Sequence, residues 1–184
     1  LDFVGQSIDL DFPCQELIIF EAKGFNFYDR ELICLDPKTL MPTQVRRDLD
    51  ILGKKENIDE IYHPDGKVVV VKRAAGKETQ QEIVKSKPAD NIYAFILRYR
   101  RHGAFKVGEQ MSLNLPTKDL ILKAMAINSI KVPAGTFESL YLQSVPSKYK
   151  VWLNTSARHL PLRISGAVGL GNTVMVLENN KDIK

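Results

Sequence analysis

A chain of 184 residues is long enough to bury its own core, and we expect a single domain over residues 1–184. It is 44% hydrophobic and 26% charged, which is typical of globular proteins and argues against general disorder. The 26 basic and 22 acidic residues nearly balance, so the net charge of +4 does not indicate a nucleic-acid partner. The apolar runs are far shorter than the ~20 residues of a transmembrane helix, so no membrane-spanning segment is expected.

Apolar and polar residues alternate along most of the chain, which predicts β-strands. In the first half, strands are expected over 7–12, 17–20, 30–35, 43–49, 58–62 and 68–71, the first of them ending at Pro13. Gly24 and Asn26 lie between the second and third strands and favour a hairpin centred on Gly24. Turns are predicted at Asp36–Leu40, where Asp36 can accept hydrogen bonds from backbone amides two residues on, and at His63–Gly66.

One segment has the periodicity of a helix. Ile92, Phe95, Ile96 and Tyr99 recur at the spacing of one helical face, which predicts a helix over 91–101. Asp90 is expected to cap its N-terminus and Gly103 to supply a left-handed C-cap. Its apolar stripe needs a sheet to bury against, so we expect it to pack on the concave side of the surrounding strands.

The stretch 117–128 fits both a helix and a strand. Thr117 suits a helix N-cap, whereas Leu120, Leu122 and Ala124 fit one face of a strand. We favour the strand, because the turn at Pro133–Gly135 joins it to an alternating partner over 137–143 and the hairpin buries both consistently. Further strands are expected near 148–154, 162–166 and 173–178, with frayed residues at 179–184.

Several short motifs occur in order along the chain: Val132–Phe137, Val151–Leu153 and Arg158–Ile164, with Asp36–Pro42 and Asp90–Arg98 upstream. Together they resemble the domain of unknown function 3108 family of bacterial envelope proteins, and the resemblance covers about residues 30–178. It implies an exported, all-β protein of unassigned function. We therefore expect a periplasmic or cell-envelope location, with a signal or lipid anchor removed before Leu1.

The expected fold class is mainly β: one long curved antiparallel sheet or half-open barrel, with the single helix on its concave side. This architecture is similar to that of bacterial lipoprotein carriers, which is an analogy of fold alone. The hollow of such a sheet is a candidate site for a hydrophobic or lipid-like ligand, with Phe95, Tyr99 and Trp152 as candidate lining residues. Trp152 lies on the opposite strand face from Val151 and Leu153, and burial in the core is the favoured alternative for it.

Cys14 and Cys34 are a candidate disulfide. Each lies ten residues from Gly24, so a hairpin centred there would place them opposite each other. An oxidising envelope would permit the bond, whereas two free cysteines would simply be small buried apolar residues.

No catalytic motif or metal-ligand spacing is visible, and His63, His102 and His159 lie far apart in the sequence. We therefore expect neither enzymatic activity nor a cofactor. The favoured function is binding of a hydrophobic or lipid-like ligand in the sheet's hollow. The alternative is a structural protein that docks to an envelope partner and binds no small molecule.

Overall fold

The computed structural model describes residues 2–4, 12, 14–103, 106–156, 159–168 and 171–178. The chain divides into two compact units, one formed by residues 1–97 with 114–118 and the other by residues 98–113 with 119–184. The expectation of a single domain stays a prediction. Most of the strand expected over 7–12 lies outside the described residues.

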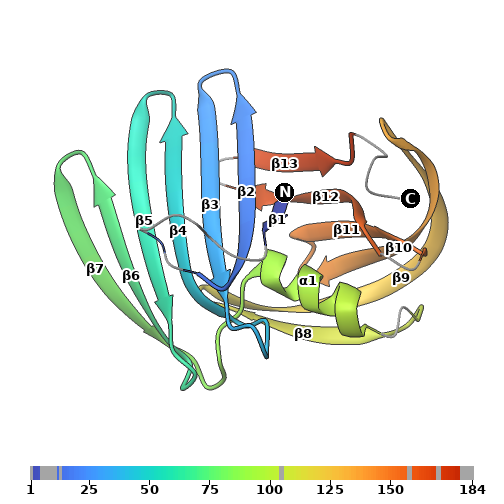
Figure 1. The fold of residues 1–184 in the computed structure, drawn as a ribbon, viewed down its shortest axis with the longest axis horizontal. Coiled ribbons are helices and arrows are strands. Elements are labelled where there is room, and N and C mark those ends of the chain that lie inside the picture. The colour runs from blue at the N-terminus through green and yellow to red at the C-terminus, as the bar shows by residue number, and fades with distance from the viewer. Residues whose placement is uncertain are drawn as a thin grey trace. The chain divides into compact units, whose positions relative to one another are not determined.

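The fold is mainly β, but its strands form two antiparallel sheets rather than the one long sheet that we expected (Figure 1). Sheet A has seven strands in the order of the chain, and all six connections that join them lead to a neighbouring strand. Its strands are β1 (Asp2–Val4), β2 (Glu16–Gly24), β3 (Phe27–Leu35), β4 (Pro42–Ile51), β5 (Lys54–Tyr62), β6 (Lys67–Ala74) and β7 (Lys77–Val84).

Sheet B has six strands, again with sequential strands as neighbours. They are β8 (Gln110–Leu115), β9 (Lys118–Val132), β10 (Gly135–Val145), β11 (Tyr149–Asn154), β12 (Pro161–Val168) and β13 (Gly171–Val176). The ambiguous stretch 117–128 belongs to β9, so the preference for a strand is confirmed. The expected turn is also confirmed, since Val132 pairs with Gly135 and Gly135 has a φ of 139°.

The helix α1 (Ile92–His102) begins and ends one residue later than predicted. Its capping differs from our expectation: Asn91 accepts a hydrogen bond from the Tyr93 amide at 2.9 Å, while Asp90 accepts from the amide of Asn91. Gly103 is not left-handed. A Cβ there would lie 2.5 Å from the carbonyl oxygen of Tyr99, so glycine is needed for a close approach.

The two faces of sheet A are distinguished by the side-chain alternation along each strand. On one face, Phe12 packs with Leu17, Leu32 and Cys34 in a small apolar cluster. On the other, Phe20 stacks on Tyr93 of α1 with ring centroids 4.9 Å apart. The first turn of the helix therefore buries against this second face, which we call the helix-side face.

Two of the predicted turns of sheet A have the expected chemistry. Asp36 Oδ1 accepts hydrogen bonds from the amides of Lys38 and Thr39, at 3.0 and 2.7 Å. Gly66 has a φ of 91°, and a Cβ there would lie 2.4 Å from the carbonyl oxygen of Lys85. Gly66 is thus required twice, by its backbone conformation and by its close neighbour.

Candidate functional site

A group of ionisable side chains lies on the helix-side face of sheet A. Paired residues on neighbouring strands share one face of a sheet, and the register places these side chains on the face of Phe20: Phe20 pairs with Glu31, Glu31 with Arg47, and Val45 with Glu60. We call the group the Arg47 cluster; its members are Asp29, Glu31, Arg47, Glu60 and Tyr62.

Arg47 is the basic centre of this cluster. Its Nε and Nη2 donate to the two carboxylate oxygens of Asp29 at 2.7 and 2.6 Å, a two-pronged geometry that suits a planar guanidinium. Arg47 Nε also lies 3.3 Å from Glu31 Oε1. Asp29 is fully buried, so its carboxylate depends on this partner for compensation.

The cluster holds more acid than base. Burial raises the pKa of Glu31 to about 7, with Asp29 and Glu60 adding to the rise and Arg47 opposing it. Burial also raises the pKa of Glu60, against the effects of the Tyr62 hydrogen bond and Arg47. The pKa of Tyr62 rises for the same reason, and its hydroxyl donates to Glu60 Oε2.

Burial opposes the charge on Arg47, but Asp29 and Glu31 outweigh it and raise the pKa of the guanidinium. Arg47 therefore stays charged, while Glu31 exchanges a proton near neutral pH. Carboxyl groups with raised pKa values are typical of functional sites, although ion-pair networks also produce such shifts.

Sequence reasoning did not find this cluster, because charged residues in an alternating strand suggest a solvent-facing side. The signal was present in β3, where Asp29 and Glu31 share strand parity with Ile33 and Leu35. Acidic residues in phase with apolar ones point to the buried face of a strand. All four side chains are buried here.

Phe95 and Tyr99, which we expected to line a ligand hollow, are packed inside the protein. Phe95 and Tyr99 are buried on α1, at 8% and 6% exposure, and the Tyr99 hydroxyl donates to Glu109 Oε2 at 2.8 Å. Their role in lining a ligand hollow stays a prediction.

The preference for a core position at Trp152 is wrong. Val151 and Leu153 are buried, whereas Trp152 is half-buried on the other face of sheet B. There its ring stacks on Tyr141 at 4.8 Å, and the Arg163 guanidinium lies 5.1 Å from its centroid. Tyr141, Trp152 and Arg163 are cross-strand neighbours, so this stack is a ladder that supports three adjacent strands.

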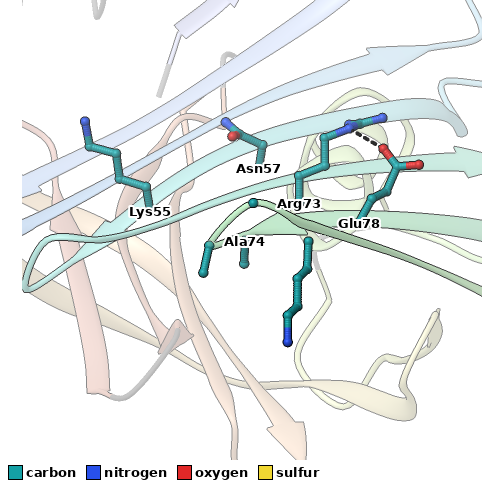
Figure 2. A pocket seen from close by; sticks show the side chains of 8 residues that line it. Lys55, Asn57, Arg73, Ala74 and Glu78 are labelled. Atoms are coloured by element: carbon teal, nitrogen blue, oxygen red, sulfur yellow. Dashed lines mark hydrogen bonds and ion pairs between the residues drawn. The ribbon is translucent and has the colours of Figure 1, made fainter.

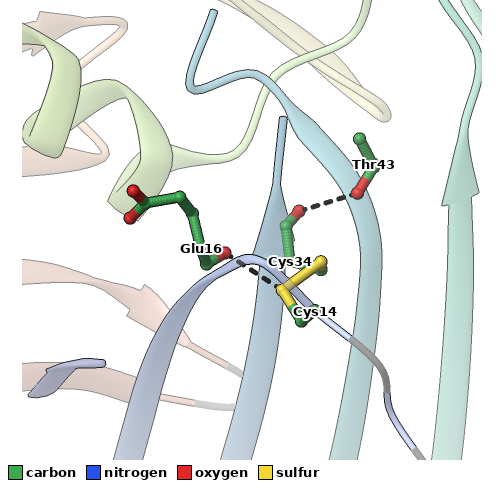
Figure 3. The surroundings of a disulfide bond; sticks show 4 residues. All are labelled: Cys14, Glu16, Cys34 and Thr43. Atoms are coloured by element: carbon green, nitrogen blue, oxygen red, sulfur yellow. Dashed lines mark hydrogen bonds between the residues drawn. A yellow bond between two sulfur atoms is a disulfide. The ribbon is translucent and has the colours of Figure 1, made fainter. Parts of the chain in front are cut away.

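Cys14 and Cys34 form a disulfide in the structure, with Cα atoms 5.6 Å apart (Figure 3). Our reasoning about register was nevertheless wrong. Gly24 pairs with Phe27, so the hairpin centre lies between Phe25 and Asn26, and the strand partner of Cys34 is Leu17. Cys14 instead precedes β2, and the bond holds this preceding segment against β3.

Among the described residues, no group of three or more histidine, cysteine or acidic side chains is arranged to hold a metal ion. In the same part of the chain, no helix is long and apolar enough to cross a membrane.

These features define a mainly antiparallel β protein that has, within its described residues, one helix, a disulfide and a buried carboxylate cluster beside the helix. The chain belongs to the family described as protein of unknown function DUF3108, whose model matches residues 23–178. The match begins slightly earlier than the resemblance suggested and includes the whole Arg47 cluster. No curated protein and no solved structure matches the chain.

Proposed function

We propose that this chain is a non-enzymatic binding protein of the bacterial envelope that holds a lipid-like ligand against the helix-side face of sheet A. The observation that carries the proposal is the acid excess of the Arg47 cluster beside half-buried apolar side chains. Such a surface suits an amphiphile, with its chain on the apolar part and its polar end on the carboxyl groups.

The charges of the cluster indicate which polar end fits. Asp29, Glu31 and Glu60 share one guanidinium, and Arg47 already makes two hydrogen bonds to Asp29. A ligand that brings a hydroxyl or an ammonium group would supply donors to Glu31 and Glu60 and relieve the repulsion between them. A ligand with a carboxylate end would add to that repulsion.

The apolar part of the surface continues from the cluster across β5 and β6. Ile58 pairs with Arg47 across the strands, and Val70 pairs with Glu60, so both share the face of the cluster. Both side chains are half-buried, whereas Ile33 and Val45 on the same face are buried. Covering Ile58 and Val70 with an acyl chain would remove further apolar area from water.

The proposed envelope location rests on two supports. One is the location that the motif resemblance in the sequence implies, and the other is the disulfide between Cys14 and Cys34. Disulfides form and persist in oxidising compartments and are rare in the cytosol.

Native mass spectrometry of the freshly purified, oxidised protein tests the proposal. The expected result is a population with an added mass of lipid size that is lost in the Glu60→Gln variant. This variant keeps an acceptor for the Tyr62 hydroxyl, so it should still fold. Glu82→Gln, at an exposed position of β7, is the matched control and should keep the adduct. An apo mass for the wild type, together with no uptake of a long-chain amine, would refute the proposal.

One observation favours the alternative of docking to an envelope partner. β7 is an edge strand of sheet A, and its side chains are exposed from Lys77 to Glu82. An edge strand offers backbone donors and acceptors to a partner strand. Crosslinking in the native envelope should then give a reproducible partner that is lost when Gln81 is replaced by proline.

A further inference from the structure

The hairpin tips at one end of sheet A carry exposed apolar side chains. The β2–β3, β4–β5 and β6–β7 connections lie at the same end, because consecutive antiparallel strands alternate in direction (Figure 1). Phe25 is 96% exposed at the first tip, and Leu52 is 72% exposed at the second. The two tips touch, since the Leu52 amide donates to the Asn26 carbonyl at 2.8 Å.

Leu52 is an unusual residue for its turn. Leu52 and Gly53 have φ angles of 54° and 78°, the left-handed pair of a two-residue hairpin loop in which asparagine, aspartate or glycine is favoured. A leucine is strained in this conformation, and its side chain gains little packing in return because most of it is exposed. Packing within the folded chain therefore does not account for an apolar side chain at this tip.

Positive charge surrounds these apolar tips. Lys54 and Lys55 follow the second tip, and Lys77 follows the third. None of the three forms an ion pair with another residue in the part of the chain that the structure describes. Of the carboxylates nearby, Glu21 pairs with Lys23 at 2.8 Å and Glu78 with Arg73 at 2.7 Å. Asp50 accepts a hydrogen bond from the Gly53 amide at 2.9 Å and is the cross-strand partner of Lys55.

A shallow, open pocket lies beside the third tip (Figure 2). Its basic lining residues are Lys55, Arg73 and Lys77, and Arg73 turns toward Glu78. Lys55 lies on the same face of sheet A as Arg73, whereas Lys77 lies on the opposite face, so each face of this end offers a lysine to an anionic group from outside.

We propose that this end of sheet A, with Phe25 and Leu52 at its tips and Lys54, Lys55 and Lys77 around them, docks onto an anionic membrane surface. The two apolar side chains enter the boundary between headgroups and acyl chains, and the lysines face the lipid phosphates. Exposed apolar tips ringed by lysine are the combination by which a protein lies on a membrane without spanning it. The docking is independent of the ligand proposed for the helix-side face.

Flotation with vesicles of phosphatidylcholine, with and without phosphatidylglycerol, tests this inference. The wild type should float with the anionic vesicles, with weaker binding at higher salt. The double variant Phe25→Ser, Leu52→Asn should bind about tenfold or more weakly. Replacing Lys54, Lys55 and Lys77 by glutamine should weaken binding roughly fivefold per lysine.

The variants also separate docking from folding. Asparagine suits the left-handed position of Leu52, so Leu52→Asn should melt at the same temperature as the wild type or higher. Val84 is 76% exposed and pairs with Lys67 at the opposite end of the hairpins, so Val84→Ser is the matched control and should bind like the wild type.

Three outcomes would overturn the inference. They are failure of the wild type to float with anionic vesicles, equal loss of binding in Val84→Ser, and full binding by the double variant. Self-association in sedimentation that the double variant abolishes, without vesicle binding, would assign the tips to a second copy of the chain instead.

Discussion

Replacing Glu31 by glutamine tests the electrostatic account of the Arg47 cluster. Glu31 is 9% exposed, and burial raises the pKa of its carboxyl from an ordinary 4.5 to about 7. The folded chain thus keeps a proton on Glu31 over a pH range in which the unfolded chain has lost it. The stability that this proton contributes is complete below about pH 4.5 and is lost as the pH rises toward 7. Glutamine cannot ionise, so the variant lacks this loss.

The size of the effect follows from the two pKa values. Between about pH 5 and about pH 8, the titration of Glu31 should lower the free energy of unfolding of the wild type by about 2.5 kcal/mol more than that of Glu31→Gln. Comparing the change between two pH values cancels any constant effect of the amide on Arg47.

Urea denaturation of both proteins at the two pH values measures this difference. Glu82→Gln, which replaces an exposed carboxylate on β7 outside the Arg47 cluster, is the matched control for the removal of one carboxyl group. If the stability difference between Glu31→Gln and the wild type does not change with pH, then Glu31 is ionised in the folded protein over this whole range, and burial does not raise its pKa as we describe.

Other predictions concern the disulfide and one turn. Intact-mass measurement after alkylation should show no modified thiols without reductant and two after reduction. Two alkylated thiols in the unreduced protein would contradict the bond. Replacing Cys14 and Cys34 by serine should lower the free energy of unfolding by about 3 kcal/mol. Gly66→Ala should destabilise the protein by about 1–3 kcal/mol more than Gly53→Ala. Both glycines have positive φ, but only at Gly66 would a Cβ meet the Lys85 carbonyl oxygen, whereas no atom lies within 4 Å at Gly53. Equal melting temperatures for the two variants would contradict that contact.

Much of the fold could be predicted because its strands and turns have local signals. The Asp36 turn, Gly66 and Gly135 all show the backbone chemistry that their sequences indicate. β7 was not predicted, since its run from Lys77 to Glu82 is polar and exposed and owes its conformation to pairing with β6. The division into two sheets was missed for a similar reason: local alternation identifies a strand, but it does not say which strands share a sheet.

The candidate site was less predictable than the fold. Arg47, Glu31 and Glu60 lie on three different strands, and the register that aligns them depends on two hairpins. A one-residue slip in either hairpin would turn one of these side chains to the opposite face. Our own register for the first hairpin was displaced, so spacing from Gly24 gave an incorrect strand partner for Cys34.

The central claim is that the Arg47 cluster receives the polar end of a lipid-like ligand. The preference of the protein for one ligand headgroup over another tests this claim most directly. A long-chain amine and a fatty acid of equal length, each carrying the same fluorophore at the far end of its chain, would be titrated into the wild type and into Glu60→Gln. The account predicts that the wild type binds the amine about tenfold or more tightly than the fatty acid, and that Glu60→Gln reduces this preference. Equal binding of the two probes, a preference for the fatty acid, or no binding of either would contradict it.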